Sequence, residues 1–425
     1  MKRIFLIILV LVPLASQGQF DRWFEPRTMR FDYYHAGNAG TEEYYFAQVR
    51  EEAHWGGSRV SLIDEKEYGN QFFKIIDAAS GETIYSRGFC TLWNEWQTTA
   101  EAMRVFKSMP ESVVFPFPKN DIRIEIFSRD HAGKFVKKFV QEISPSSYFI
   151  ARYPRRYETF DVEINGPAEH RVDIVLLPEG YAAAERAGFE EACRGFAEAM
   201  FSFEPYRELR GKFNIRAVWV PSTDSGVTIP GEGVWKNTSA KASFWTFDSE
   251  RYQMTEDFHT LRDQAGEVPY DLIYVLSNTD KYGGGGIYNF YGLSSANHPV
   301  STAKVYVHEF GHLLLGLGDE YVGGVSYEEE SMYPTDREPW EENLTTLVGF
   351  DGKEWSRMLP AGTPVPTPLS AESAERLGVY EGGGYVATGV YRPWPNCLMN
   401  NLHAIDKFCP VCTAGIRSQI EFLCR

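Results

Sequence analysis

Short apolar runs separated by turn residues dominate the first part of the chain. Residues 72–77 and 83–86 form two such runs on either side of Gly81, which predicts a β-hairpin. Residues 121–127 alternate between polar and apolar side chains, as expected for a strand with one buried face. Several short strands with turns between them predict an all-β sandwich over residues 19–160.

The pattern changes near residue 170. Three buried strands are expected, at residues 172–178, 213–220 and 271–276. A long amphipathic helix is expected at residues 182–203. A second helix is expected near residue 302. Strands interspersed with helices predict an α/β or α+β domain over residues 161–425. Within it, the stretch 322–384 is rich in Pro, Gly and acidic residues and is expected to be irregular.

The first residues have the features of a targeting segment. Lys2 and Arg3 precede the apolar run 4–14, and small residues at Ser16 and Gly18 predict cleavage before Gln19. The run is shorter than the roughly 20 residues that a membrane-spanning helix needs, and the alternative is a buried N-terminal strand. We therefore expect residues 1–18 to be a signal peptide and the mature protein to be exported, either periplasmic or extracellular.

Composition and charge narrow the class of partner. The chain has 42 Lys and Arg against 58 Asp and Glu, a net charge of −16, which argues against nucleic acid and against a basic membrane-docking surface. The hydrophobic fraction of 43% and the charged fraction of 24% are ordinary for a folded globular protein. The expected partner is therefore a protein or glycoprotein, and the sequence does not determine the oligomeric state.

One motif carries specific chemistry, the stretch from His308 to His312, which reads His-Glu-Phe-Gly-His. On a helix, two histidines four residues apart project from one face, so both imidazoles can bind one zinc ion. Glu309 can then lie beside a metal-bound water and act as its general base. Ser301 can cap this helix, and its apolar residues predict a buried one. The alternative is an ordinary core helix.

A third zinc ligand is expected after the turn at Gly316 and Gly318. Asp319 is the first carboxylate beyond that turn, and three protein ligands plus an open position describe a catalytic zinc site. Glu320 is the competing candidate, and a residue far away in sequence is the remaining alternative.

Residues around Met399 resemble the methionine-containing turn that lies under the metal in metzincin-type zinc peptidases. Two departures are evident, because the spacer after His312 is longer and a carboxylate replaces the third histidine. Asn401 also stands where many metzincins carry a tyrosine. The oxyanion-stabilising residue therefore stays open, with Tyr321 and Tyr391 as candidates.

The glycine run 283–286 follows the strand expected at 271–276. In zinc peptidases an edge strand before the metal helix binds the substrate backbone, and glycines allow close approach. Gly285, Gly286 and Ile287 are thus candidate substrate-binding residues. The alternative is a flexible surface loop.

Whether the six cysteines form disulfides depends on the compartment in which the protein resides. Cys397, Cys409, Cys412 and Cys424 lie near the end of the chain, and in an exported protein at least one local disulfide is expected among them. Cys409 and Cys412 could instead form half of a zinc ribbon or a redox motif.

The chain resembles the immunoglobulin-A metallopeptidase family of secreted bacterial zinc peptidases. The resemblance rests on six stretches, at residues 175–181, 224–227, 233–238, 283–286, 308–321 and 408–412. It implies an accessory β-domain and a zincin-like, metzincin-like catalytic domain with one catalytic Zn²⁺ ion. It does not imply that immunoglobulin A is the substrate.

The combined prediction is a secreted zinc-dependent endopeptidase that hydrolyses peptide bonds of protein or glycoprotein substrates. Zinc is expected on His308, His312 and Asp319, with Glu309 as general base and Met399 in the turn below. The alternative is a non-catalytic protein that binds glycans or glycoproteins and keeps a relic or structural zinc site. An intact Glu309 argues against it, because a structural site has no use for a base.

Overall fold

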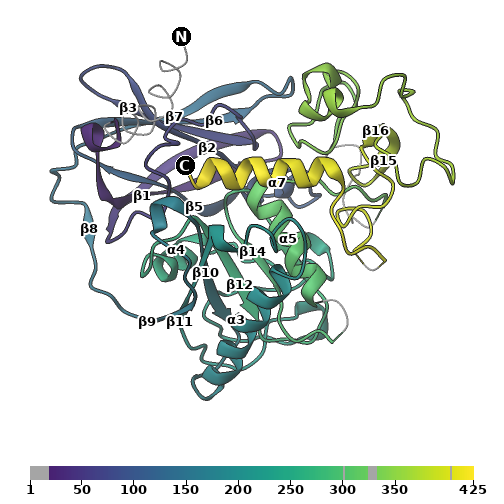
Figure 1. Cartoon of the computed structure of the whole chain (residues 1–425). Coiled ribbons are helices and arrows are strands. Elements are labelled where there is room, and N and C mark those ends of the chain that lie inside the picture. The colour runs from purple at the N-terminus through teal and green to yellow at the C-terminus, as the bar shows by residue number, and fades with distance from the viewer. Residues whose placement is uncertain (1–18, 300–301, 324–332, 403) are drawn as a thin grey trace, which may run out of the picture.

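The structure is a computed structural model that describes residues 19–299, 302–323, 333–402 and 404–425 (Figure 1). The expected signal peptide and the capping residue Ser301 lie outside the described residues. No helix in the described ranges has the length and apolar character needed to cross a membrane.

The N-terminal part is a β-sandwich, as predicted. Its two four-stranded sheets have the orders β5-β1-β2-β8 and β4-β3-β6-β7. The strands are β1 Phe24–Asn38, β2 Thr41–Glu52, β3 Gln71–Asp77, β4 Thr83–Phe89, β5 Lys107–Pro118, β6 Ile122–Arg129, β7 Phe135–Ile143 and β8 Ala151–Arg152. The expected hairpin is the antiparallel pair β3–β4. Alternate side chains from both sheets, such as Phe31, Phe73 and Phe115, fill the space between them.

The second part is built on a six-stranded sheet with the order β13-β14-β12-β10-β11-β9. Its strands are β9 Glu158–Glu163, β10 Val172–Glu179, β11 Phe213–Trp219, β12 Leu272–Ser277, β13 Gly284–Gly286 and β14 Gly292–Ser295. The four inner strands are parallel and the two edge strands are antiparallel. Strand β10 is buried along its whole length, which explains its continuous apolar run. The domain border expected at residue 160 falls inside β9.

Helices cover both faces of this sheet. They are α3 Arg186–Met200, α4 Phe258–Ala265, α5 Thr302–Leu315 and α7 Pro410–Leu423. Ile174 and Leu176 of β10 pack in one core with α3, α5 and α7, whereas the alternate residues Val175 and Leu177 pack in a second core with α4. The second core also takes up Trp93 and Trp96 from α2 (Leu92–Gln97), which follows strand β4 of the sandwich.

The last helix joins the two parts. Figure 1 shows α7, in yellow, running between the sandwich and the α/β part. The Ser58 hydroxyl donates a hydrogen bond of 2.5 Å to the carbonyl oxygen of Arg425. The Arg87 guanidinium lies 4.9 Å from the ring centroid of Phe422. These contacts place the end of the chain against the sandwich.

The region after α5 has little regular structure in its described residues. It contains the hairpin β15 Tyr380–Gly383 with β16 Val386–Arg392 and the 3-10 helices η6 Phe350–Gly352 and η7 Glu354–Met358. The remaining 3-10 helices are η1 Ala168–His170, η2 Ala183–Glu185, η3 Arg210–Lys212, η4 Pro230–Glu232 and η5 Thr246–Asp248.

Candidate active site

Helix α5 presents the two histidines of the motif to the same point in space. The Nε2 atoms of His308 and His312 lie 3.2 Å apart. Val307 and Phe310 are buried on other sides of the helix and anchor it in the core. The helical spacing of four residues thus brings both imidazoles together, as the sequence predicts.

Two backbone carbonyl groups orient these imidazoles. His308 Nδ1 donates to the Leu398 carbonyl oxygen at 3.2 Å, and His312 Nδ1 donates to that of Leu317. A carbonyl oxygen only accepts, so Nδ1 carries the proton and Nε2 of the neutral ring keeps a free lone pair. Both rings are therefore held in the tautomer that a metal ion requires.

The turn after α5 brings Asp319 back to the histidines. Gly316 has a φ of +67°, and a Cβ there would lie 2.2 Å from the Trp340 ring, so both conformation and space favour glycine. Asp319 Oδ1 lies 3.1 Å from His308 Nε2 and 3.4 Å from His312 Nε2. Its other oxygen, Oδ2, accepts a hydrogen bond of 2.6 Å from the Tyr385 hydroxyl.

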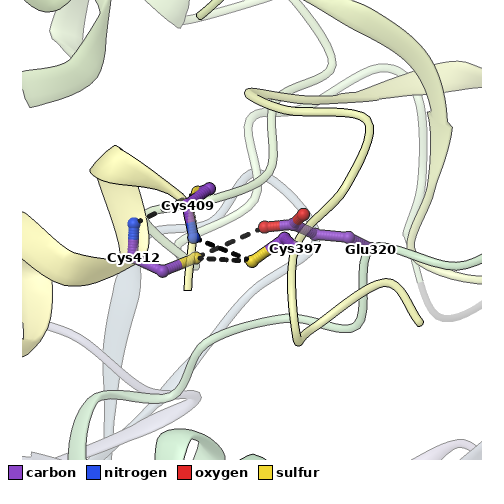
Figure 2. Close-up of side chains that lie close together, drawn as sticks. All are labelled: Glu320, Cys397, Cys409 and Cys412. Atoms are coloured by element: carbon purple, nitrogen blue, oxygen red, sulfur yellow. Dashed lines mark hydrogen bonds between the residues drawn. The ribbon is translucent and has the colours of Figure 1, made fainter. Parts of the chain in front are cut away.

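Glu320 points to a different centre. Its Oε1 accepts a 2.9 Å hydrogen bond from Asn343 Nδ2. The same oxygen lies 3.3 Å from the Cys412 sulfur (Figure 2). The structure therefore brings Asp319, and not Glu320, to the imidazoles.

The three converging atoms fit a tetrahedral divalent ion. Their separations lie between 3.1 and 3.4 Å. Ligands at about 2.0–2.1 Å from a tetrahedral ion are about 3.3–3.4 Å apart, which matches. Two imidazole nitrogens and a carboxylate oxygen are also a donor set that suits zinc.

The electrostatics of the group favour a cation. Burial opposes the charge on Asp319, but the adjacent imidazoles hold the pKa of this carboxyl far below its usual range. Burial likewise opposes protonation of His312, yet the Asp319 carboxylate raises the pKa of this imidazole to about 9. Asp319 is thus a carboxylate at neutral pH, and a metal ion would take the place of protons on the two rings.

Glu309 lies beside this group on α5 and lines the cleft. Burial and the nearby Asp319 raise the pKa of Glu309, while the two imidazoles act in the opposite direction. A raised pKa brings a carboxylate closer to the range in which general bases work.

Met399, the residue of the predicted methionine turn, packs against α5. It is fully buried, and a Cβ on Gly311 of the helix would lie 3.3 Å from its sulfur. Its neighbour Leu398 holds His308, and its own carbonyl oxygen accepts a 2.8 Å hydrogen bond from the Glu320 amide. The turn therefore supports both the helix and the segment that carries Asp319.

The glycine run forms an edge strand rather than a loop. Strand β13 pairs antiparallel with β14 at the end of the sheet. A Cβ on Gly286 would lie 2.2 Å from the Glu309 carbonyl oxygen, so this glycine lets β13 pack directly on α5. Gly285, Gly286 and Ile287 all line the cleft, but Ile287 has a buried side chain, and its amide donates to the Tyr291 carbonyl oxygen.

A cleft of about 850 Å³ lies over these groups. The sandwich contributes part of its wall through Tyr68, Asn94, Glu95 and Arg129, which no sequence motif indicated. The Tyr252 hydroxyl donates a 2.7 Å hydrogen bond to Glu95 and so links the two parts of the molecule at the cleft.

Of the two candidate oxyanion tyrosines, one lies at the cleft and the other does not. Tyr321 lines the cleft, whereas Tyr391 is on β16 and its hydroxyl lies 3.5 Å from Glu381. Tyr385 was not anticipated, although it follows a run of glycines and adopts a positive φ of 71°. Such a backbone conformation is costly for a tyrosine and often marks a functional position.

The expected disulfide near the end of the chain is wrong. All six cysteines lie in the described residues and all are free. The sulfurs of Cys397 and Cys412 are 3.8 Å apart, far beyond the roughly 2.05 Å of a disulfide bond.

The metal-helix motif, the turn after it and the edge strand lie around an open cleft, and comparison with known families gives the class of protein. The sequence model of the family IgA Peptidase M64 matches residues 161–377 and 369–420. The model of the Peptidase M64 N-terminus matches residues 19–140. The chain belongs to the IgA peptidase M64 family, which makes it a peptidase with protein substrates and suggests dependence on a metal. No curated protein matches the chain significantly.

Proposed function

We propose that the protein is an exported zinc-dependent endopeptidase, with zinc held by His308, His312 and Asp319. The observation that carries the proposal is the convergence of His308 Nε2, His312 Nε2 and Asp319 Oδ1 to within 3.1–3.4 Å of one another beside Glu309. A structural zinc site is closed by four protein ligands, whereas this set offers three and faces a cleft.

Glu309 is the proposed general base. When bound, zinc lowers the pKa of a water ligand and polarises a carbonyl group. The Glu309 carboxylate takes the proton of the attacking water and delivers it to the nitrogen of the departing amine. Its raised pKa makes it a stronger base than an exposed glutamate for the first of these transfers.

Asp319 and the imidazoles need fixed orientations for this role. Tyr385 holds Oδ2 of Asp319, which leaves Oδ1 directed at the histidines. The carbonyl oxygens of Leu398 and Leu317 hold His308 and His312. Outer partners of this kind typically contribute about 10–100-fold to metal affinity or activity.

The substrate is proposed to bind as an added strand along β13. In an antiparallel ladder successive residues direct their backbone groups alternately towards and away from the partner strand. Gly285 is opposite Leu293, and the flanking amides of Ser295 and Ile287 bond across the same pair of strands. Gly286 therefore has its N–H and C=O groups on the outer edge, beside the cleft. The outward amide of Gly284 already donates to the Arg251 carbonyl oxygen at 3.3 Å, so the part of this edge proposed to pair with an extended substrate is at Gly286.

The test is hydrolysis of a protein mixture by the purified chain, with products identified by mass spectrometry. We expect internal fragments, loss of activity with a chelator and recovery with added zinc. Glu309→Gln should retain zinc and lose about 10²-fold or more in turnover. A wild-type chain that binds zinc and protein substrates without cleaving them would instead indicate the non-catalytic alternative.

Export is a separate part of the proposal. It is supported by the basic, apolar and small-residue order of positions 1–18. N-terminal sequencing of the protein released by cells should begin at or near Gln19. A mature chain that starts at Met1 and stays inside the cell would refute it.

A further inference from the structure

A second cluster of potential ligands lies apart from the histidine site. Glu320, Cys397, Cys409 and Cys412 offer one carboxylate oxygen and three sulfurs, all within 4.8 Å of one another (Figure 2). All four side chains are buried, with exposures between 0% and 2%. They come from three separate segments: the turn after α5, the methionine turn and the start of α7.

The distances in this cluster match a tetrahedral metal site better than a disulfide. Two sulfurs at about 2.3 Å from a tetrahedral zinc ion are about 3.8 Å apart, and a sulfur and an oxygen are about 3.5 Å apart. The sulfurs of Cys397 and Cys412 are 3.8 Å apart, and Cys412 Sγ is 3.3 Å from Glu320 Oε1.

The buried carboxylate of Glu320 is not explained by a cluster of thiols or by a disulfide. Its Oε2 is buried and has no hydrogen-bond partner among the described residues. Arg392 acts on it electrostatically, but the guanidinium donates to the carbonyl oxygens of Glu381 and Gly382. A buried carboxylate among sulfurs is costly unless a positive charge balances it.

Backbone amides around the sulfurs favour thiolates. The amide of Cys409 donates to Cys397 Sγ at 3.3 Å, and that of Cys412 donates to Cys409 Sγ at 3.4 Å. Cys409 is also the N-cap of α7, where the helix dipole stabilises negative charge. These two amides would stabilise thiolate charge on Cys397 and Cys409 once a cation is bound.

From these observations we infer that Glu320, Cys397, Cys409 and Cys412 bind a second zinc ion, in a closed structural site. Three thiolates select a soft or borderline ion, and four protein ligands leave no open position. The ion would replace the missing positive charge beside Glu320 and protect the thiols of an exported protein from oxidation. This inference does not depend on the catalytic proposal.

The second site would clamp the segments that shape the first. Glu320 follows Asp319 directly, and Cys397 precedes Leu398, whose carbonyl oxygen holds His308. The Glu320 amide also donates to the Met399 carbonyl oxygen. An ion that joins Glu320 to Cys397 therefore fixes Asp319 relative to the histidine helix.

The test separates the two ions. The purified chain should contain about two zinc ions, and the double variant His308→Ala/His312→Ala should retain about one. X-ray absorption of that variant should show sulfur scatterers at about 2.3 Å, and cobalt substitution should give thiolate charge-transfer absorption. All six thiols should be titratable after denaturation with a chelator.

A double variant without zinc, a coordination shell of nitrogen and oxygen alone, or a thiol count reduced by a disulfide would each overturn the inference. Cys409→Ser in the same background should lose the remaining ion, and Cys193→Ser should keep it. Cys193 is the matched control because it is equally buried but lies on α3, away from the cluster. The measurement on the double variant leaves the cluster intact, so it decides the question even if Cys409→Ser fails to fold.

Discussion

Asp319 and Glu320 are adjacent in the chain, yet their carboxylates enter two different buried centres. Asp319 Oδ1 lies 3.1 Å from His308 Nε2, while Glu320 Oε1 lies 3.3 Å from the sulfur of Cys412. The side chains of these two successive residues therefore point away from each other. One short segment thus connects the candidate catalytic site to the cysteine cluster, and each carboxylate can be removed separately.

Asp319→Ala should abolish zinc binding at the histidine site. Two imidazoles alone hold zinc poorly, so affinity there should fall by more than the about 10–100-fold that follows loss of an outer partner. Activity should fall in parallel and recover only partly with added zinc. Zinc content per chain and zinc titration, compared between the wild type and Asp319→Ala with the cysteine cluster intact, measure the change. If Asp319→Ala binds zinc with unchanged affinity, Asp319 is not a zinc ligand.

Tyr385→Phe should weaken the same site without removing a ligand. The variant loses the 2.6 Å hydrogen bond to Asp319 Oδ2, and we expect a loss of about 10–100-fold in zinc affinity or in kcat/KM. Tyr391→Phe is the control, because its hydroxyl lies near Glu381 and does not line the cleft. Equal behaviour of the two variants would contradict the positioning role of Tyr385.

Local patterns were sufficient to predict the parts of the site that are close in sequence. The spacing of His308 and His312 on an apolar helix, and the glycine turn before Asp319, determine their geometry with little help from the rest of the fold. For the glycines at Gly284–Gly286 the sequence left two alternatives, an edge strand and a flexible loop, and it did not indicate why glycine is needed at position 286. Gly286 is needed for the close approach of α5, which depends on how the sheet packs.

Features formed by distant segments could not be predicted in the same way. Tyr385 meets Asp319 only where the segment before β16 folds back on the turn after α5, and Glu95 enters the cleft only where the two parts of the molecule pack together. The cysteines were expected to form a disulfide because they are close in sequence. Side-chain direction, which the tertiary fold sets, instead gathers three of them around Glu320.

Gly286→Ala should distort the contact between β13 and α5. The new Cβ would lie 2.2 Å from the Glu309 carbonyl oxygen, and such overpacking typically costs about 1–3 kcal/mol. We expect a lower Tm and a rise in KM, since the strand proposed to bind substrate must move. Gly195→Ala is the control, because a Cβ there meets nothing within 4 Å and helix α3 favours alanine. A Gly286→Ala variant with unchanged Tm and KM would argue against the close contact.

Glu95 should make stability depend on pH. Burial raises the pKa of this carboxyl to about 7 from an ordinary value of 4.5, against the opposing effects of the Tyr252 hydroxyl and His312. Because the folded state then holds the proton more tightly than the unfolded state, the contribution to stability is complete below pH 4.5. This contribution is lost as the pH rises through about 7.

Glu95→Gln removes this ionisation and keeps an oxygen that can accept from Tyr252. Between about pH 5 and pH 8 the wild type should therefore lose more Tm than Glu95→Gln, with an upper limit of about 1.4 kcal/mol for each unit of pKa shift. Glu82→Gln, at an exposed position in the turn between β3 and β4, should follow the wild type. Parallel Tm curves for the wild type and Glu95→Gln across this range would show that Glu95 is ionised in the folded protein throughout.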